Sequence, residues 1–201
     1  MMKRITSMSR RDGLKGALAL GLAAGFAAAD KGSANADEPA RNGKVLVACF
    51  TRSGNTLVIA RQISRSLKAD FFEIRPLEPY PEDYEETVAL AERERLAGFE
   101  PPLAATVPSV DTYEKVFLAF PIWGTTAPAV IRSFLSRHDM TGKTLIPVIT
   151  HGGYGVGSSL RVLAEHAPRA RLADGFVMEA DQERRTMEQV RNWLGSAKIN
   201  G

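Results

Sequence analysis

An unbroken apolar run that leads into a short polar turn limits the folds open to this chain more than any other feature. The run is Val45–Ala48, the turn covers residues 51–56, and a second apolar run, Leu57–Ala60, follows. A strand whose side chains are all apolar is typical of a parallel sheet that is covered on both faces. The stretch therefore predicts a buried strand over residues 45–50, a tight turn, and the start of a helix.

The polar turn offers several groups that can bind an anion. Thr51, Ser53, Asn55 and Thr56 carry hydroxyl or amide groups around Gly54, which lets the backbone turn its N–H groups inward. The helix that follows adds unpaired N–H groups and the positive end of its dipole. A Walker loop is excluded because no lysine follows the glycine, and the three spaced glycines of a dinucleotide site are missing. The turn therefore favours a phosphate monoester, and the simpler alternative is that Ser53 or Asn55 only caps the helix.

The distribution of charge argues against nucleic-acid binding. The chain has 26 Lys and Arg against 23 Asp and Glu, but six of the basic and two of the acidic residues lie in positions 1–36. The remainder therefore carries 20 basic and 21 acidic residues. Because no basic surplus is left to neutralise phosphates, we expect no nucleic-acid partner.

Residues 1–36 have the organisation of an export signal. A basic start that includes Arg10 and Arg11 precedes the weakly apolar run Leu14–Ala29, and small residues end the segment at Ala36. The stretch around the two arginines resembles the twin-arginine signal, with Gly13 where a Phe is usual. The apolar run is too short and too rich in glycine to span a membrane securely. We expect a periplasmic or otherwise exported protein, cleaved near Ala36, with no stable membrane anchor.

Apolar runs alternate with helical patterns along the rest of the chain. This alternation predicts one α/β domain over residues 44–197, after a linker at 37–43, with an open five-stranded parallel sheet and helices on both faces in three layers. Residues 98–112, rich in proline, are expected to form a surface loop. The predicted strands cover residues 45–50, 69–75, 115–120, 144–150 and part of 171–178, and the predicted helices cover 55–67, 84–96, 129–137, a segment ending near 166, and a segment starting near 182.

Three polar loops follow the first, third and fourth predicted strands. They cover residues 51–56, 121–126 and 151–157. In an open parallel sheet, ligands bind outside the carboxyl ends of the strands. We therefore expect these loops to converge on one crevice.

The second and third loops contain groups suited to a planar ligand. Trp123 could stack on an aromatic ring with Gly124 leaving room, or it could simply cover the core. The glycines between His151 and Ser158 could turn N–H groups toward a ligand, or they could form only a flexible connection. Tyr154 could cover a second ring face. For His151, a bond to the backbone is the commoner case and proton donation the alternative.

Cysteine and histidine usage indicates no metal or disulfide chemistry. Cys49 is the only cysteine, which rules out an internal disulfide, and its place in an apolar strand favours a buried small side chain over a reactive thiol. His138 and His166 fall at predicted helix ends, where surface positions are expected. No His, Cys and Asp residues have the spacing of metal ligands.

The sequence from Val45 to about Met178 resembles one branch of the flavodoxin-like proteins. The turn Thr51-x-Ser-Gly-Asn-Thr56 is similar to their phosphate loop, and the runs 121–123 and 150–153 are similar to the loops that follow the third and fourth strands. The resemblance implies FMN bound noncovalently. Two departures stand out, since Gly124 replaces a frequent second aromatic residue and Tyr154 replaces a small one.

The resemblance assigns three sets of residues to the cofactor. They are Thr51, Arg52, Ser53, Gly54, Asn55 and Thr56; Pro121, Ile122, Trp123, Gly124 and Thr125; and His151, Gly152, Gly153, Tyr154 and Gly157. No catalytic residue and no nicotinamide motif can be identified.

Two functions are compatible with such a domain. The first is an FMN-dependent oxidoreductase that passes electrons from a nicotinamide or another donor to a quinone-like acceptor. The second is a noncatalytic electron carrier between protein partners. Carriers of this fold tend to be strongly acidic, so the near-neutral charge of residues 37–201 favours the oxidoreductase.

Overall fold

The computed structural model describes residues 44–179, 190 and 192–196. All of them belong to one structural unit, residues 38–201. The predicted export signal, the linker at 37–43 and the start of the last helix lie outside the described residues. Within the described part of the chain, no helix is both long enough and apolar enough to cross a membrane.

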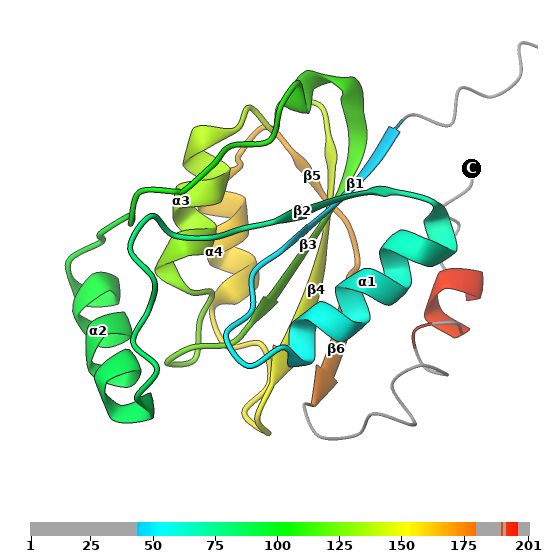
Figure 1. Ribbon diagram of the computed structural model, residues 1–201. Coiled ribbons are helices and arrows are strands. Elements are labelled where there is room, and N and C mark those ends of the chain that lie inside the picture. The colour runs from blue at the N-terminus through cyan, green and yellow to red at the C-terminus, as the bar shows by residue number, and fades with distance from the viewer. Residues whose placement is uncertain (1–43, 180–189, 191, 197–201) are drawn as a thin grey trace, which may run out of the picture. The chain divides into compact units, whose positions relative to one another are not determined.

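The predicted parallel sheet is confirmed (Figure 1). Its strands run in the order β2-β1-β3-β4-β5, and β6 also pairs with β4. Every pairing is parallel. The strands are β1 (Lys44–Cys49), β2 (Asp70–Glu73), β3 (Tyr113–Pro121), β4 (Thr144–His151), β5 (Arg171–Leu172) and β6 (Phe176–Glu179).

The predicted fifth strand is present as two segments, β5 and β6, because of a proline in β4. Pro147 has no N–H to donate, and its carbonyl oxygen faces Gly175 so closely that a Cβ at Gly175 would lie 2.1 Å from it. Leu145 of β4 pairs with Leu172, and Val148 of β4 pairs with Phe176. Two residues lie between the paired positions on β4, whereas three lie between them on the outer strand. The outer strand therefore contains one extra residue opposite the proline, as in a β-bulge.

Helices cover both faces of the sheet (Figure 1). Along β1, Leu46 and Ala48 pack in the cluster formed with α3 (Ala129–Arg137) and α4 (Ser159–His166). The alternate side chains Val47 and Cys49 pack in the cluster formed with α1 (Asn55–Leu67), to which residues 190, 193 and 194 also contribute. This alternation gives the predicted three layers.

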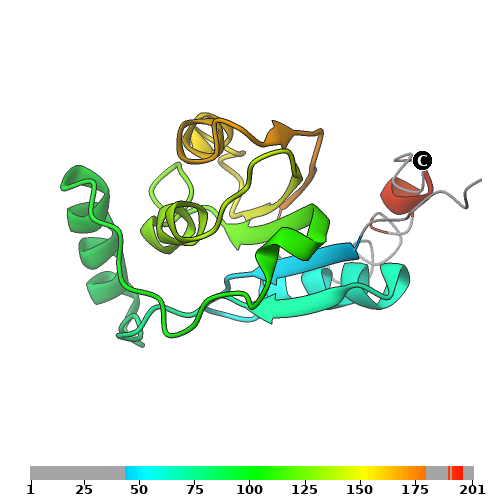
Figure 2. The same ribbon diagram turned by 90° about the horizontal axis from the view of Figure 1, so that it is seen from above.

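Helix α2 (Tyr84–Leu96) lies outside these layers. Figures 1 and 2 both show it at the outer side of the domain, away from the strands. The segments before and after it run side by side, joined by an isolated antiparallel bridge between Pro76 and Leu103. The second segment ends in the short 3₁₀ helix Val110–Thr112. Residues 98–112 therefore form the predicted loop, and part of this loop pairs with the segment that precedes α2.

Candidate functional site

The turn before α1 has the geometry of an anion cradle. Gly54 is the N-cap of α1, with φ of +92°, and its N–H donates to the Thr51 hydroxyl at 3.0 Å. No side chain caps the helix, so the alternative in which Ser53 or Asn55 is a cap is wrong. The N–H groups of the first turn therefore have no side-chain acceptor, and they fit the oxygens of a phosphate. The side chains of Ser53 and Asn55 are exposed beside them.

Thr56 differs from the other polar residues of this turn. Its side chain is buried, and its hydroxyl shares a hydrogen bond of 2.8 Å with the hydroxyl of Thr150 at the end of β4. The strand beneath it therefore holds this hydroxyl in place, and its contact with a ligand stays a prediction. Thr56 instead ties the start of α1 to the fourth strand.

Arg52 extends from the same turn toward α2. Its guanidinium donates to the backbone oxygen of Glu82 at 3.0 Å and lies 5.8 Å from the ring centre of Tyr84. Both residues belong to the start of α2 or the segment just before it. Arg52 thus connects the turn at the start of α1 with the helix outside the layers.

The loop after β3 forms a tight turn around two left-handed residues. The Trp123 N–H donates to the backbone oxygen of Thr126 at 2.9 Å, and the Thr126 N–H donates to the backbone oxygen of Trp123 at 3.1 Å. Between them Gly124 has φ of +53° and Thr125 has φ of +65°. A left-handed conformation is uncommon for a β-branched residue and costs on the order of 1–3 kcal/mol, so the surrounding contacts must hold it.

Those contacts come from the loop after β4. The Ser158 N–H donates to the Thr125 oxygen at 3.0 Å, and the Ser158 and Thr126 hydroxyls bond at 2.9 Å. Gly157 lies so close that a Cβ there would be 1.8 Å from the Thr125 oxygen. The Ile122 N–H also donates to the oxygen of Thr150 at 2.8 Å. Together with the Thr56–Thr150 bond, these contacts join all three loops, whereas their convergence on one crevice stays a prediction.

Trp123 packs against two other rings. Its ring centre lies 5.3 Å from that of Phe50 and 4.7 Å from that of Tyr80, with nearly perpendicular planes. These edge-to-face contacts fix the indole. Trp123 therefore covers part of the core, as one alternative had it, and it also lines the cavity described next.

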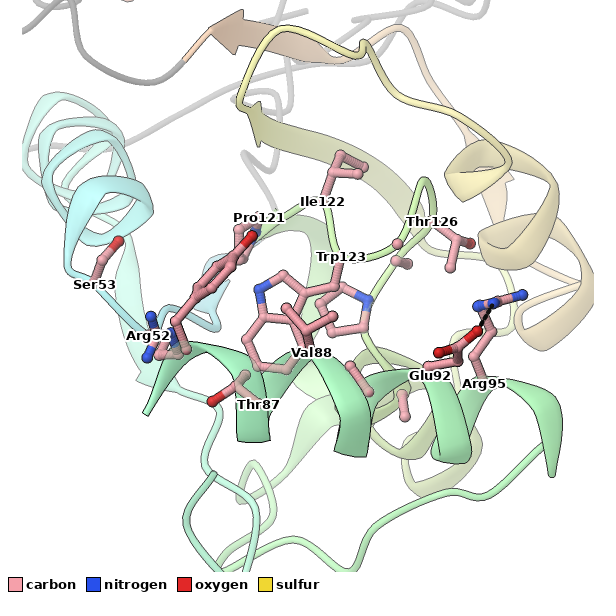
Figure 3. Close-up of a pocket in the computed structure, with 16 residues that line it drawn as sticks. Arg52, Ser53, Thr87, Val88, Glu92, Arg95, Pro121, Ile122, Trp123 and Thr126 are labelled. Carbon is pink, nitrogen blue, oxygen red and sulfur yellow. Dashed lines mark ion pairs between the residues drawn. The ribbon is translucent and has the colours of Figure 1, made fainter. Parts of the chain in front are cut away.

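A cavity of about 470 Å³ opens beside the first two loops (Figure 3). Six of the predicted cofactor residues line it, namely Arg52, Ser53, Pro121, Ile122, Trp123 and Gly124. The other ten do not: Thr51, Gly54, Asn55, Thr56, Thr125, His151, Gly152, Gly153, Tyr154 and Gly157. The start of α3 also lines the cavity, and one side of α2 forms a wall. A cavity of this size is within the range of small-molecule sites.

The family model for flavodoxin matches residues 44–197. The chain belongs to the flavodoxin family. No curated protein matches its sequence significantly.

Several solved structures resemble this flavodoxin-family chain. A candidate flavoprotein from Bacteroides uniformis is 26% identical, with a TM-score of 0.68, and the match covers 77% of this chain and 99% of that one. A candidate flavoprotein from Bacteroides eggerthii is 29% identical, with a TM-score of 0.66 and coverage of 76% and 96%. A flavoprotein from Lactobacillus acidophilus in complex with FMN is 17% identical, with a TM-score of 0.61 and coverage of 73% and 99%. At that identity the last match shows the fold alone.

The α2 wall of this flavodoxin-family site was missed in the sequence. The sequence predicted a helix over 84–96 but did not assign it to the site, whereas one side of the helix faces the cavity. These residues recur at helical spacing and mix apolar with charged side chains, which is the signal that could have revealed them. The residues are Tyr84, Thr87, Val88, Ala91, Glu92 and Arg95.

A buried polar network holds α2 in this position. Tyr80 donates its hydroxyl proton to Glu94 at 2.8 Å and accepts a bond from the Val130 N–H at the start of α3. Arg132 donates to the backbone oxygens of Glu94 and Phe99 at 3.0 and 2.9 Å. Burial raises the pKa of Glu94 and, together with the nearby Glu94 carboxylate, the pKa of Tyr80. Glu94 therefore belongs to the internal structure.

The loop after β4 carries an oriented histidine and an exposed tyrosine. The Gly153 N–H donates to Nδ1 of His151 at 3.1 Å, so His151 is bonded to the backbone, as in the commoner case. Tyr154 is 88% exposed. The structure thus leaves the Tyr154 ring free of protein contacts that would place it over a ligand.

Two reactive side chains outside the cavity, Cys49 and His138, are buried. Cys49 is completely buried, as expected, and burial, with a smaller effect from Glu73, raises its thiol pKa to about 12. The thiol is therefore protonated and unreactive at neutral pH. His138 is buried, so its predicted surface position is wrong. Among the described residues, no group of three or more His, Cys, Asp and Glu side chains is placed to hold a metal ion.

Proposed function

We propose that this protein binds FMN and uses it to pass electrons from a nicotinamide or another donor to a quinone-like acceptor. The observation that carries the proposal is the uncapped start of α1 at Gly54, which opens beside a cavity of ligand size. Membership in the flavodoxin family supports it, and so do the two Bacteroides candidate flavoproteins.

The residues present fit the parts of FMN. The N–H groups around Gly54 and the side chains of Ser53 and Asn55 would hold the phosphate without a cationic side chain. The loops at 121–126 and 151–157 would hold the ring, since their backbones are locked together by Ser158. The strained Thr125 is explained if that loop must present its backbone to a ligand.

When bound, FMN supplies the redox chemistry, and the chain supplies binding, orientation and electrostatics. A nicotinamide gives up a hydride, which carries two electrons and one proton. A quinone takes up two electrons and two protons to become a hydroquinone, so the second proton comes from solvent. The cavity walled by α2 would hold the acceptor out of bulk water.

The alternative function is a noncatalytic carrier of electrons between protein partners. A carrier needs an accessible cofactor edge but no space for a substrate, whereas this cavity extends beyond the predicted cofactor residues to the α2 wall. The near balance of 20 basic and 21 acidic residues after position 36 also gives no acidic surface field for docking. Both observations favour the oxidoreductase.

The test uses the chain purified without residues 1–36. Titration with FMN, followed by flavin fluorescence, should show binding, and the loaded protein should oxidise NADH or NADPH when a naphthoquinone is added. A protein that takes up no FMN would contradict the whole proposal. A loaded protein that oxidises neither nucleotide, yet transfers electrons from a separate reductase to cytochrome c, would establish the carrier instead.

A further inference from the structure

The cavity has two ends with different chemistry. Figure 3 shows Arg52 and Ser53 at one end, Arg95 and Thr126 at the other, and Trp123 between them. The Ser53 end adjoins the turn that fits a phosphate. The end near Arg95 is therefore separated from the phosphate turn by the indole.

Arg95 presents donor groups with little competition from the protein. Its side chain is 43% exposed, and its ion pair with Glu92 spans 3.7 Å. An exposed pair of that length contributes little. A guanidinium carries five N–H donors in a planar fork that matches a carboxylate or a sulfonate. Most of these donors are thus available to an anionic group in the cavity.

The loop after β3 leaves the space that Arg95 needs. A Cβ at Gly124 would lie 3.7 Å from Nε of Arg95, and any larger side chain would extend into the region of the guanidinium. Gly124 also has φ of +53°, which L side chains rarely adopt. This chain therefore has a glycine at the position of the frequent second aromatic residue, and Arg95 lies beside the space that the glycine leaves open.

Several other residues that line the cavity are apolar or small. Val88 and Ala91 come from α2, and Pro128 and Ala129 come from the start of α3. The charged residues that line the cavity are two arginines and one glutamate, so positive charge is in excess. A flat apolar ligand with one negative substituent matches this combination.

We propose that the Arg95 end of the cavity binds the anionic substituent of a planar, quinone-like substrate. This inference rests on the proposed function, because it assigns the acceptor of the same site. Arg95 acts as a specificity-determining residue through a bidentate bond to the carboxylate or sulfonate. Trp123, Val88 and Ala91 contact the apolar ring.

Arg93 provides a matched control. It belongs to the same helix and is exposed, but it does not line the cavity. Replacing it removes the same charge from the same helix, so any difference between the two variants reflects position. Arg95→Lys keeps the charge and removes the fork.

The experiment compares 1,4-naphthoquinone-2-sulfonate with neutral 2-methyl-1,4-naphthoquinone as acceptors for the FMN-loaded protein. Arg95→Ala should raise KM for the sulfonate at least about tenfold and leave the neutral quinone nearly unchanged, since a bond to a charged group is lost. Arg95→Lys should recover part of the loss, and Arg93→Ala should change neither acceptor. Equal effects of Arg95→Ala on both quinones would overturn the inference.

A binding measurement separates this inference from the proposed function. Calorimetric titration with anthraquinone-2-sulfonate needs no turnover and can be run with and without FMN. Loss of sulfonate binding in Arg95→Ala supports the anion subsite even if no nucleotide is oxidised. Unchanged sulfonate binding, or weaker FMN binding in its place, would overturn it, whereas failure of the unmodified protein to take up FMN would contradict only the proposed function.

Discussion

Helices α1 and α2 both face the candidate site, but they are held to the domain by different forces. Helix α1 buries Ile59, Ala60 and Ile63 against the sheet. Helix α2 buries only Thr87 and Glu94, and hydrogen bonds hold both of them. The first helix is thus fixed by apolar burial and the second by polar contacts.

This difference assigns separate tasks to the two walls of the site. Apolar burial is tied to the folding of the whole sheet, so the phosphate turn should open only when the domain unfolds. Polar contacts can be broken one at a time while the sheet persists. The structure therefore combines a rigid cofactor turn with a substrate wall that can loosen locally.

The largest expected effect comes from the α1 side. Ile63→Ala removes a fully buried side chain and should lower the free energy of unfolding by about 2–5 kcal/mol. Chemical denaturation monitored by circular dichroism measures this value. Val88→Ala, at a position of α2 that lines the cavity and is 44% exposed, is the control and should cost far less. Similar losses in the two variants would contradict the contrast between the helices.

The next effect should be confined to α2. Glu94→Ala leaves the Tyr80 hydroxyl without its acceptor and should cost about 1–3 kcal/mol, because a buried polar group loses its partner. Hydrogen exchange should become faster in α2 and stay unchanged in β3. Glu92→Ala removes an exposed carboxylate from the same helix and should leave exchange as it was. Faster exchange throughout the sheet would show that α2 is not an independent unit.

A third prediction concerns the two hydroxyl residues of the phosphate turn. Ser53→Ala should weaken the binding of FMN by about 1–2 kcal/mol more than the binding of riboflavin, because only FMN carries the phosphate that the Ser53 hydroxyl would bind. Thr56→Ala should lower the unfolding free energy without this difference, since its hydroxyl bonds Thr150. Fluorescence titration with both flavins measures the two affinities. Equal losses of FMN and riboflavin in Ser53→Ala would place the phosphate elsewhere.

The smallest effect depends on pH and involves the segment that leads from α2 back to the sheet. The Val107 N–H donates to Nε2 of His138 at 2.8 Å, Nδ1 bonds the Phe134 oxygen, and burial lowers the His138 pKa. Below the ordinary histidine pKa of about 6.5, the unfolded chain takes up a proton that the folded chain excludes. Stability should therefore fall as the pH drops from 6.5 through the lowered pKa.

A variant at His138 checks this dependence. His138→Gln should remove this part of the pH dependence of the unfolding free energy. Denaturation at several pH values between 5 and 8 gives the comparison. An unchanged slope in His138→Gln would assign the dependence to other groups.

The sequence predicted the architecture well because the sheet is built from apolar runs. The bounds of α1, α2 and α3 are those expected, and the three loops meet as the parallel topology requires. The split of the outer strand could not be predicted, because the need for Gly175 arises from a carbonyl on a neighbouring strand. No local pattern records such a contact.

Individual side chains in the site were harder to predict than the loops that carry them. Thr56 and Glu94 look like exposed polar residues in the sequence, and both are buried by partners far along the chain. His138 was misjudged for the same reason. A hydrogen bond over a long sequence separation leaves no spacing to detect, whereas periodic apolar burial does.

The break in the outer strand also affects how copies of the protein can associate. An uninterrupted outer strand is a template on which another chain can add a strand and begin to aggregate. Here β5 spans two residues, β6 spans four, and the extra residue opposite Pro147 shifts their register relative to β4. An incoming strand cannot match both segments in one alignment. The proline that interrupts the ladder thereby protects this side of the sheet from edge-to-edge pairing.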